Sequence, residues 1–216
     1  MSNKGLIGLI TALLMVGTAG TASANLVTNG DFSAGNTGFT SAYAYSNPMY
    51  WQPTHYTVGN YVETPHASFY DHTAGTPAGS MMIVDGAYSA SATVWQENII
   101  VTPDSDYEFK AWARSTYDGP LVMLGFLINN VQVGTLTLAG TSTKDWQEFR
   151  CIWNSGSVTG ATLRIVDLQT NNSVPGNDFA LDDISFSGSA VPLPAAGWLF
   201  GSGLLGLAGL RKTAKR

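Results

Sequence analysis

Three histidines and one aspartate form the densest group of side chains in the sequence with catalytic or metal-binding chemistry: His55, His66, Asp71 and His72. Three imidazoles and a carboxylate can in principle bind zinc. The spacings of eleven and six residues between the histidines match no standard zinc pattern, however, and there is no His-Glu-x-x-His sequence. We therefore expect Asp71 and His72 to fix a loop through hydrogen bonds.

No other pattern in the sequence predicts catalysis. The Gly-x-Ser-x-Gly elbow of serine hydrolases and the glycine-rich phosphate loop are absent. A glycosidase needs two carboxylates that face each other across a groove, and the acidic residues are too scattered to pair. Cys151 is the only cysteine, so no internal disulfide can form, and we expect it to be a small buried side chain. The sequence predicts a protein that is not an enzyme.

Aromatic residues are concentrated between Tyr43 and His72. Sugars stack on aromatic rings through their weakly polar faces, while their hydroxyl groups need directed donors and acceptors. On this basis the predicted ligand-binding residues are Tyr50, Trp51, Tyr56 and His72. Ordinary packing beneath loops explains the same aromatics equally well, and both interpretations stay open.

Strand patterns must position these side chains, because no run with helical periodicity precedes the C-terminal tail. In the strand Tyr107–Ser115, alternate residues form one apolar and one polar face, and Trp112 falls on the polar face as either a ligand platform or a packed side chain. Many antiparallel strands with short turns predict an all-β sandwich or jelly roll. The other predicted strands are Leu26–Phe32, Met81–Asp85, Ala92–Val101, Leu121–Ile128, Val131–Leu138, Trp146–Trp153, Thr162–Asp167 and Phe179–Phe186.

The two ends of the chain differ from this middle part. Residues 1–24 have the features of a secretory signal peptide: Lys4, an apolar stretch, and a small-x-small cleavage site that ends at Ala24. Residues 189–216 contain an apolar segment that would be roughly 24 Å long as a helix, followed by a basic cluster. We expect this segment to be a single transmembrane helix. The folded domain is then residues 25–188.

The charge of that domain excludes one class of partner. The whole chain carries 15 acidic and 10 basic residues, and five of the basic residues lie in the two end segments. A domain this acidic has no basic patch and repels nucleic acid. We therefore expect no DNA or RNA partner.

The C-terminal segment also contains the sequence Val191-Pro192-Leu193-Pro194, directly before the apolar stretch and the basic tail. This three-part arrangement resembles the PEP-CTERM sorting signal, whose usual motif has Glu where this chain has Leu193. The resemblance implies recognition by an exosortase, export across the inner membrane of a Gram-negative bacterium, and a final place at the cell surface or outside the cell. An ordinary C-terminal membrane anchor would give the same topology without cleavage.

Two passages at the ends of the domain carry a second resemblance: Asn25-Leu26-Val27-Thr28-Asn29-Gly30-Asp31-Phe32 and Leu181-Asp182-Asp183-Ile184-Ser185-Phe186. They look like the opening and closing strands of galactose-binding-like jelly rolls, which many carbohydrate-binding modules share. In that family the two strands lie side by side and a structural calcium often joins them. The resemblance implies Asp31 and Asp183 as calcium ligands, with Asp182 as the next candidate.

Regular strand geometry limits this calcium prediction. Successive side chains of a strand point to opposite faces, so we expect that Asp182 and Asp183 cannot both enter one site. Where many family members have Glu, this chain has Ser33, so one expected carboxylate is missing.

The leading functional hypothesis is a non-catalytic surface module that binds extracellular polysaccharide. The second is a structural component of the extracellular matrix without a specific ligand. The third is a glycan hydrolase, for which the sequence offers no catalytic pair.

Overall fold

The structure is a computed structural model, and it describes residues 24–64, 67–88, 92–117, 122–138, 145–169 and 177–188. The predicted signal peptide up to residue 23, the sorting motif Val191–Pro194 and the predicted transmembrane helix lie outside the described residues, as does His66. Within the described ranges, no helix is long and apolar enough to span a bilayer.

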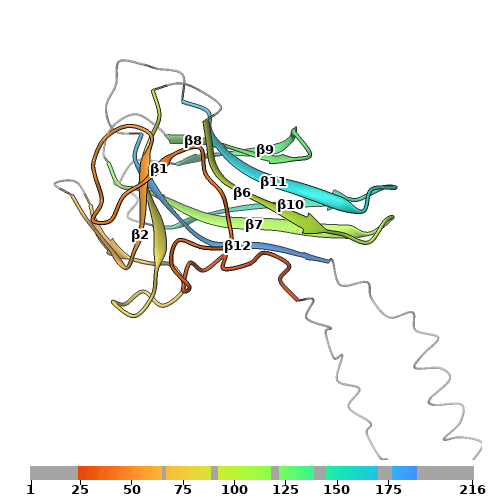
Figure 1. Cartoon of the computed structure of the whole chain (residues 1–216), viewed down its shortest axis with the longest axis horizontal. Helices are drawn as coiled ribbons and strands as arrows, with labels where there is room; N and C mark the ends of the chain where they lie inside the picture. Colours follow the sequence, from red (N-terminus) through yellow and green to blue (C-terminus); the bar gives the residue numbers. More distant parts are fainter. Residues whose placement is uncertain are drawn as a thin grey trace, which may run out of the picture. The chain divides into compact units, whose positions relative to one another are not determined.

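Two β-sheets and a separate hairpin make up the domain (Figure 1). Neighbouring strands pair antiparallel in both sheets, except for the parallel pair β1–β2. This architecture confirms the predicted all-β sandwich. The six-stranded sheet has the order β1 (Ala44–Tyr45), β2 (His55–Gly59), β5 (Met81–Asp85), β12 (Phe179–Gly188), β7 (Asp106–Ser115) and β10 (Gln147–Asn154). The four-stranded sheet has the order β6 (Ala92–Ile100), β11 (Gly160–Asp167), β8 (Val122–Ile128) and β9 (Val131–Leu138). The hairpin consists of β3 (Tyr61–Glu63) and β4 (Ser68–Tyr70).

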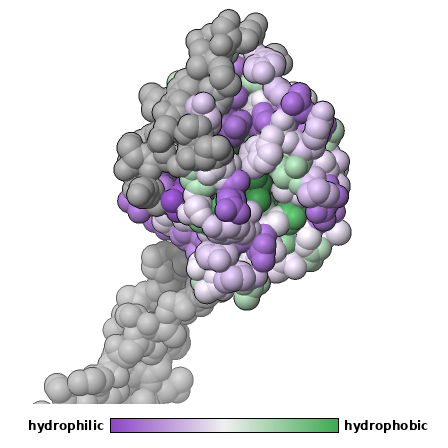
Figure 2. All heavy atoms as spheres, turned by 90° about the vertical axis from the view of Figure 1, so that its left-hand side faces the viewer, coloured by the Kyte–Doolittle hydropathy of each residue, from purple (hydrophilic) through white to green (hydrophobic). Residues whose placement is uncertain are grey.

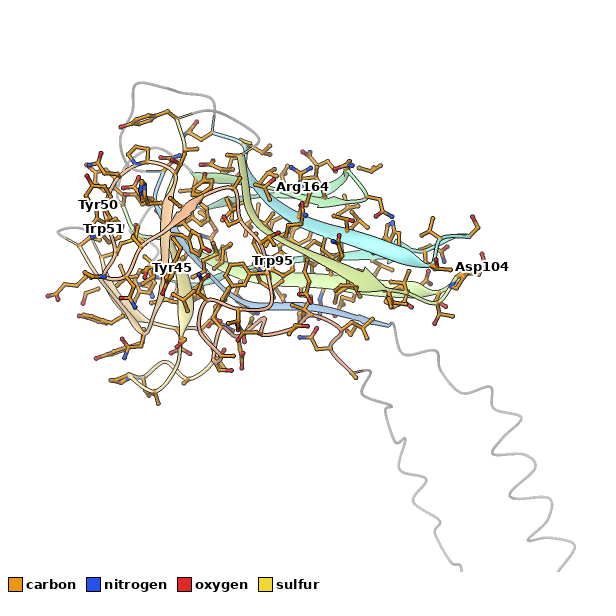
Figure 3. The ribbon with its side chains drawn as sticks, viewed as in Figure 1. Tyr45, Tyr50, Trp51, Trp95, Asp104 and Arg164 are labelled. Carbon is orange, nitrogen blue, oxygen red and sulfur yellow. The ribbon has the colours of Figure 1, made fainter. Side chains whose placement is uncertain are left out.

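The main core lies between the two sheets and follows from the alternation of side chains along the strands. In β7, Phe109, Ala111 and Ala113 are fully buried, whereas Lys110 and Trp112 between them are only half-buried. Aromatic rings fill the centre: Phe126 of β8 stacks on Phe149 of β10 with their centroids 3.6 Å apart. Figure 3 shows Trp95 in the interior, and its side chain is fully buried. The alternation therefore leaves the other face of β7 available for a site.

A second, smaller core covers part of the outer face of the six-stranded sheet. The hairpin β3–β4 packs there, and its buried residues Val62 and Phe69 join Met81, Ile83 and Ala180. The Arg114 guanidinium lies 4.0 Å from the centre of the Phe69 ring, a cation–π contact. Both clusters consist of residues between Val27 and Phe186. Residues 24–188 therefore carry a core of their own.

The opening segment of the domain, residues 25–32, differs from the prediction. It lies beside β12 as expected, with one bridge between Asn25 and Ser187 and a hydrogen bond from the Leu26 N–H to the Phe186 carbonyl. The predicted strand Leu26–Phe32 is wrong, however, because Asn29 and Phe32 adopt positive φ angles of 57° and 53° and turn the chain. The segment is thus a turn held against the last strand.

Candidate ligand-binding pocket

A β-bulge in the last strand places two neighbouring carboxylates on the same side of the sheet. Asp182 pairs with Trp112 and Ser185 pairs with Lys110, so β12 has one residue more than β7 between these pairs. Asp183 adopts a positive φ of 47° at this point. The expectation that Asp182 and Asp183 must point to opposite faces is therefore wrong, because that rule holds only for a regular strand.

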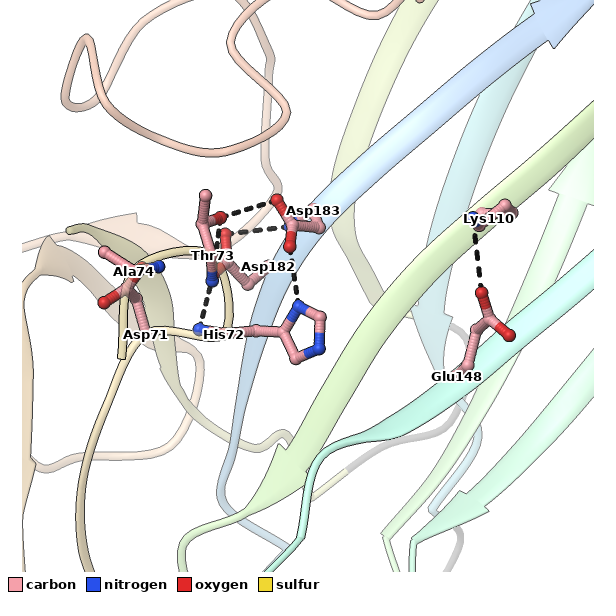
Figure 4. Close-up of polar contacts among 8 residues, drawn as sticks. All are labelled: Asp71, His72, Thr73, Ala74, Lys110, Glu148, Asp182 and Asp183. Carbon is pink, nitrogen blue, oxygen red and sulfur yellow. Dashed lines mark hydrogen bonds and ion pairs between the residues drawn. The ribbon is translucent and has the colours of Figure 1, made fainter. Parts of the chain in front are cut away.

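Both carboxylates hold the loop that follows β4 (Figure 4). Asp182 Oδ2 accepts hydrogen bonds from the backbone N–H groups of His72 (2.7 Å) and Thr73 (3.1 Å). Asp183 accepts one from the Thr73 hydroxyl at 2.6 Å. Within the loop, the N–H of Ala74 donates to the Asp71 carboxylate at 2.6 Å. The expectation that Asp71 and His72 help to fix a loop by hydrogen bonding is confirmed.

These contacts fix the position of the His72 ring. Its Nδ1 lies 2.6 Å from Asp183 Oδ2, and the ring stacks on Trp112 with centroids 4.0 Å apart and planes 16° apart. Trp146 packs edge-on against the same ring, with the two ring centroids 5.8 Å apart. The outer face of β7 thus carries a stack of imidazole on indole.

The Asp182 carboxyl beneath the same loop has a shifted pKa. Burial, helped by the negative charge of Asp183, raises the pKa of Asp182 to about 7, although three backbone N–H groups oppose this rise.

A pocket of about 440 Å³ lies next to this stack, between the opening segment and the outer face of the six-stranded sheet. Strands β7 and β12 contribute one group of lining residues and the opening segment contributes the other. The lining residues are Asn25, Val27, Asn29, Gly30, Asp31, Lys110, Trp112, Asp183, Ile184 and Ser185.

Some polar groups of the pocket hold the fold together, and others are placed to meet a ligand. The side-chain amide of Asn25 is committed to the fold, since its Oδ1 accepts hydrogen bonds from the N–H groups of Val27 and Phe186. Lys110 lies at the rim with its Nζ 3.3 Å from a carboxylate oxygen of Glu148. The wall also has an indole, two carboxylates and a hydroxyl, from Trp112, Asp31, Asp183 and Ser185. The pocket wall is therefore mostly polar around a single indole, which suits a ligand rich in hydroxyl groups.

The structure brings together both predicted calcium ligands, since Asp31 and Asp183 line the same pocket. Their carboxylates already accept hydrogen bonds from protein groups. Asp31 Oδ1 accepts from the Ser33 N–H and hydroxyl, and Asp183 accepts from His72 and Thr73. Among the described residues, no group of three histidine, cysteine or acidic side chains is arranged to hold a metal. Calcium binding by these two residues stays a prediction.

The other predicted ligand residues do not join this pocket. Tyr50 and Trp51 are 58% and 38% exposed, and Figure 3 shows them at the end of the domain opposite Asp104. Figure 2 shows that end as mostly polar, with a small apolar hollow near its centre. Tyr56 is buried in the main core, and its hydroxyl donates to the Asn36 side chain at 2.8 Å. Only His72 lies next to the pocket.

Sequence reasoning named Trp112 as an open alternative and did not identify Lys110 or Ser185 as site residues. The alternation of side chains along β7 and β12 predicts that Lys110 and Ser185 face outward, but it does not show which part of that face stays uncovered.

The sequence analysis also did not identify a pair of acids, Asp85 and Asp178, whose carboxyl groups contact each other on the same face near the end of β5. Burial and the charge of Asp178 raise the pKa of Asp85 to about 7, and burial also raises the pKa of Asp178.

The contact between Asp85 and Asp178 should make the stability of the fold depend on pH. The pKa of Asp85 is about 7 in the folded protein against an ordinary 3.8, so the folded state keeps a proton that the unfolded chain releases. The free energy of unfolding should therefore fall as the pH rises from about 4 to about 7 and then level off. Asp85→Asn stays neutral throughout, and its stability should fall less over this range. Urea denaturation across the range measures both slopes, and parallel slopes would contradict the prediction.

Comparisons with known proteins address the fold. No protein-family model matches the chain, and no curated protein sequence is similar to it. The structure is similar to the Stig cyclase Fisc from Fischerella sp. TAU, at 10% identity and a TM-score of 0.56, over 79% of this chain and 100% of that one. It is also similar to the xylan-binding domain CBM22-1 of Xyn10C from Paenibacillus barcinonensis, at 11% identity and a TM-score of 0.51, over 80% and 99% of the two chains. The chain therefore has the β-sandwich fold of these proteins.

Proposed function

We propose that this protein is an exported surface or matrix protein whose sandwich binds extracellular polysaccharide at the pocket between the opening segment and β7, without catalysing a reaction. The observation that carries the proposal is the pocket itself, which combines Trp112 with Lys110, Asp31 and Asp183. A xylan-binding domain has the same fold, which supports a carbohydrate as the ligand.

The cellular setting of this proposal comes from the end segments. A signal peptide in residues 1–24 directs export, and the segment 189–216 holds the chain in the inner membrane for an exosortase. Between them, a galactose-binding-like jelly roll with a structural calcium at Asp31 and Asp183 would present the pocket outside the cell.

Replacement of Trp112 tests the ligand site. In affinity electrophoresis through gels that contain different polysaccharides, we expect residues 24–189 to be slowed saturably by at least one of them. Trp112→Ala removes the indole face and should weaken this retention about tenfold, as expected for one stacking aromatic ring. A glycan array and a reducing-sugar assay on the same protein should show binding without sugar release.

The matched control is the double variant Tyr50→Ala/Trp51→Ala, which removes two exposed aromatics that do not line the pocket. It should be retained like the unchanged protein. Loss of retention in the control alone would instead place the site at Tyr50 and Trp51. Equal, weak retention on every polysaccharide would instead favour a structural matrix protein without a specific ligand.

A further inference from the structure

Each of the two sheets has two edge strands. Strands β1 and β10 form the edges of the six-stranded sheet, and β6 and β9 form those of the four-stranded sheet. An edge strand presents unpaired backbone N–H and C=O groups, with which another chain can pair. Natural proteins block such edges with very short strands, charged side chains, prolines, β-bulges or a covering segment.

Three of the four edges are blocked in these ways. Strand β1 has only two residues. Strand β10 carries Glu148 and Arg150, which form ion pairs with Lys110 and Glu108 of β7. Strand β6 is covered by the segment 40–42, because Thr40 and Gln96 exchange two backbone hydrogen bonds of 2.9 Å and the Ala42 N–H donates to Thr93.

The fourth edge, β9, has none of these features between Gly134 and Leu138. Its eight residues include no charged side chain and no proline. One irregularity in its pairing with β8 lies at Val133, and from Gly134 to Leu138 the register is regular. Thr135 and Thr137 are exposed in this regular part. Among the described residues, none pairs with β9 on the side away from β8.

We propose that β9 is a self-association edge, through which two copies of this chain pair antiparallel along Gly134–Leu138. The two-fold axis then passes at Leu136, and Thr135 of each copy faces Thr137 of the other. Opposed threonines are a favourable cross-strand pair, and no charges are brought together. A second copy is the expected partner because an antiparallel pair of identical edges satisfies both copies at once. The two four-stranded sheets become one continuous sheet.

Analytical ultracentrifugation of residues 24–189 tests this proposal, since this part carries a core of its own. We expect a concentration-dependent dimer. Thr135→Lys/Thr137→Lys places lysines opposite each other twice and should raise the dimer dissociation constant at least about tenfold. Thr135→Glu/Thr137→Glu should have the same effect, whereas an equal mixture of the two variants should dimerise again.

The control is Ile152→Lys, which adds one lysine, half the added charge of the double variant, at an exposed position of β10 and should leave the dimer unchanged. Because Thr135 and Thr137 are exposed, the variants should keep the far-ultraviolet circular dichroism spectrum and melting temperature of the unchanged protein. A protein that stays monomeric at every concentration would overturn the proposal, and so would a lysine variant that dimerises normally or a mixture that does not dimerise. Pocket binding plays no part in these readouts.

Discussion

An Asp182→Ala variant is expected to lose about 3 kcal/mol of folding free energy, because the substitution leaves three backbone N–H groups without the buried acceptor that they share. The Asp182 carboxylate is fully buried and accepts hydrogen bonds from the N–H groups of His72, Thr73 and Asp183. Alanine replaces none of these bonds, and water does not reach the buried position readily. Urea denaturation at constant pH measures the loss.

The same variant should weaken ligand binding under conditions in which it remains folded. The Asp182 carboxylate holds the backbone of the loop whose His72 ring stacks on Trp112, so its removal frees one wall beside the pocket. Retention on polysaccharide should therefore drop even though Asp182 does not line the pocket.

Asp183→Asn is the matched control for this prediction. It changes the neighbouring carboxylate, keeps a residue type that tolerates the positive φ, and affects donors that are partly exposed. Its cost should be clearly smaller, since water can replace the lost bonds to the His72 ring and the Thr73 hydroxyl. If Asp182→Ala were as stable as Asp183→Asn, the loop would not depend on the buried carboxylate.

The strands of the sandwich were predictable because their signal is local. In β7, polar and apolar residues alternate from Asp106 to Ala111, and the buried face in the structure is the apolar one. The turn Asn129-Asn130 between β8 and β9 has an equally local signal, since both residues adopt the positive φ that Asn tolerates. Patterns of this kind depend only on neighbouring residues.

The pocket was not predictable, because it depends on contacts between distant parts of the chain. The loop at His72 is 110 residues from Asp182, and no local pattern pairs them. The bulge at Asp183 breaks the alternation on which strand arguments rest, so the rule about opposite faces gave the wrong result there. The position of Tyr56 was also not predictable from local sequence, since its register with Val84 places its side chain in the main core.

Gly30→Ala is the second change with a large expected effect. A Cβ atom at this position would lie 1.9 Å from the carbonyl oxygen of Ile184, far closer than any real contact. The overlap involves backbone on both sides, so no side-chain rotation can relieve it. The opening segment would have to move away from β12, with loss of the 2.9 Å hydrogen bond from the Ile184 N–H to the Gly30 carbonyl.

We expect Gly30→Ala to cost at least about 3 kcal/mol, the upper end of the range for overpacking. It should also abolish retention on polysaccharide, because the moving segment forms one wall of the pocket. Gly35→Ala is the matched control. Its φ of 74° costs about 1 kcal/mol with alanine, but no atom lies within 4 Å of the added Cβ.

The comparison of these two glycines separates the pocket from general stability. Gly35→Ala strains the chain just after the opening segment without pushing that segment away from β12, so its ligand binding should be kept at a temperature where both variants are folded. Equal binding by both variants would mean that the close approach of Gly30 to Ile184 does not form the ligand site. Loss of binding in Gly30→Ala alone would tie ligand recognition to the contact between the two ends of the domain.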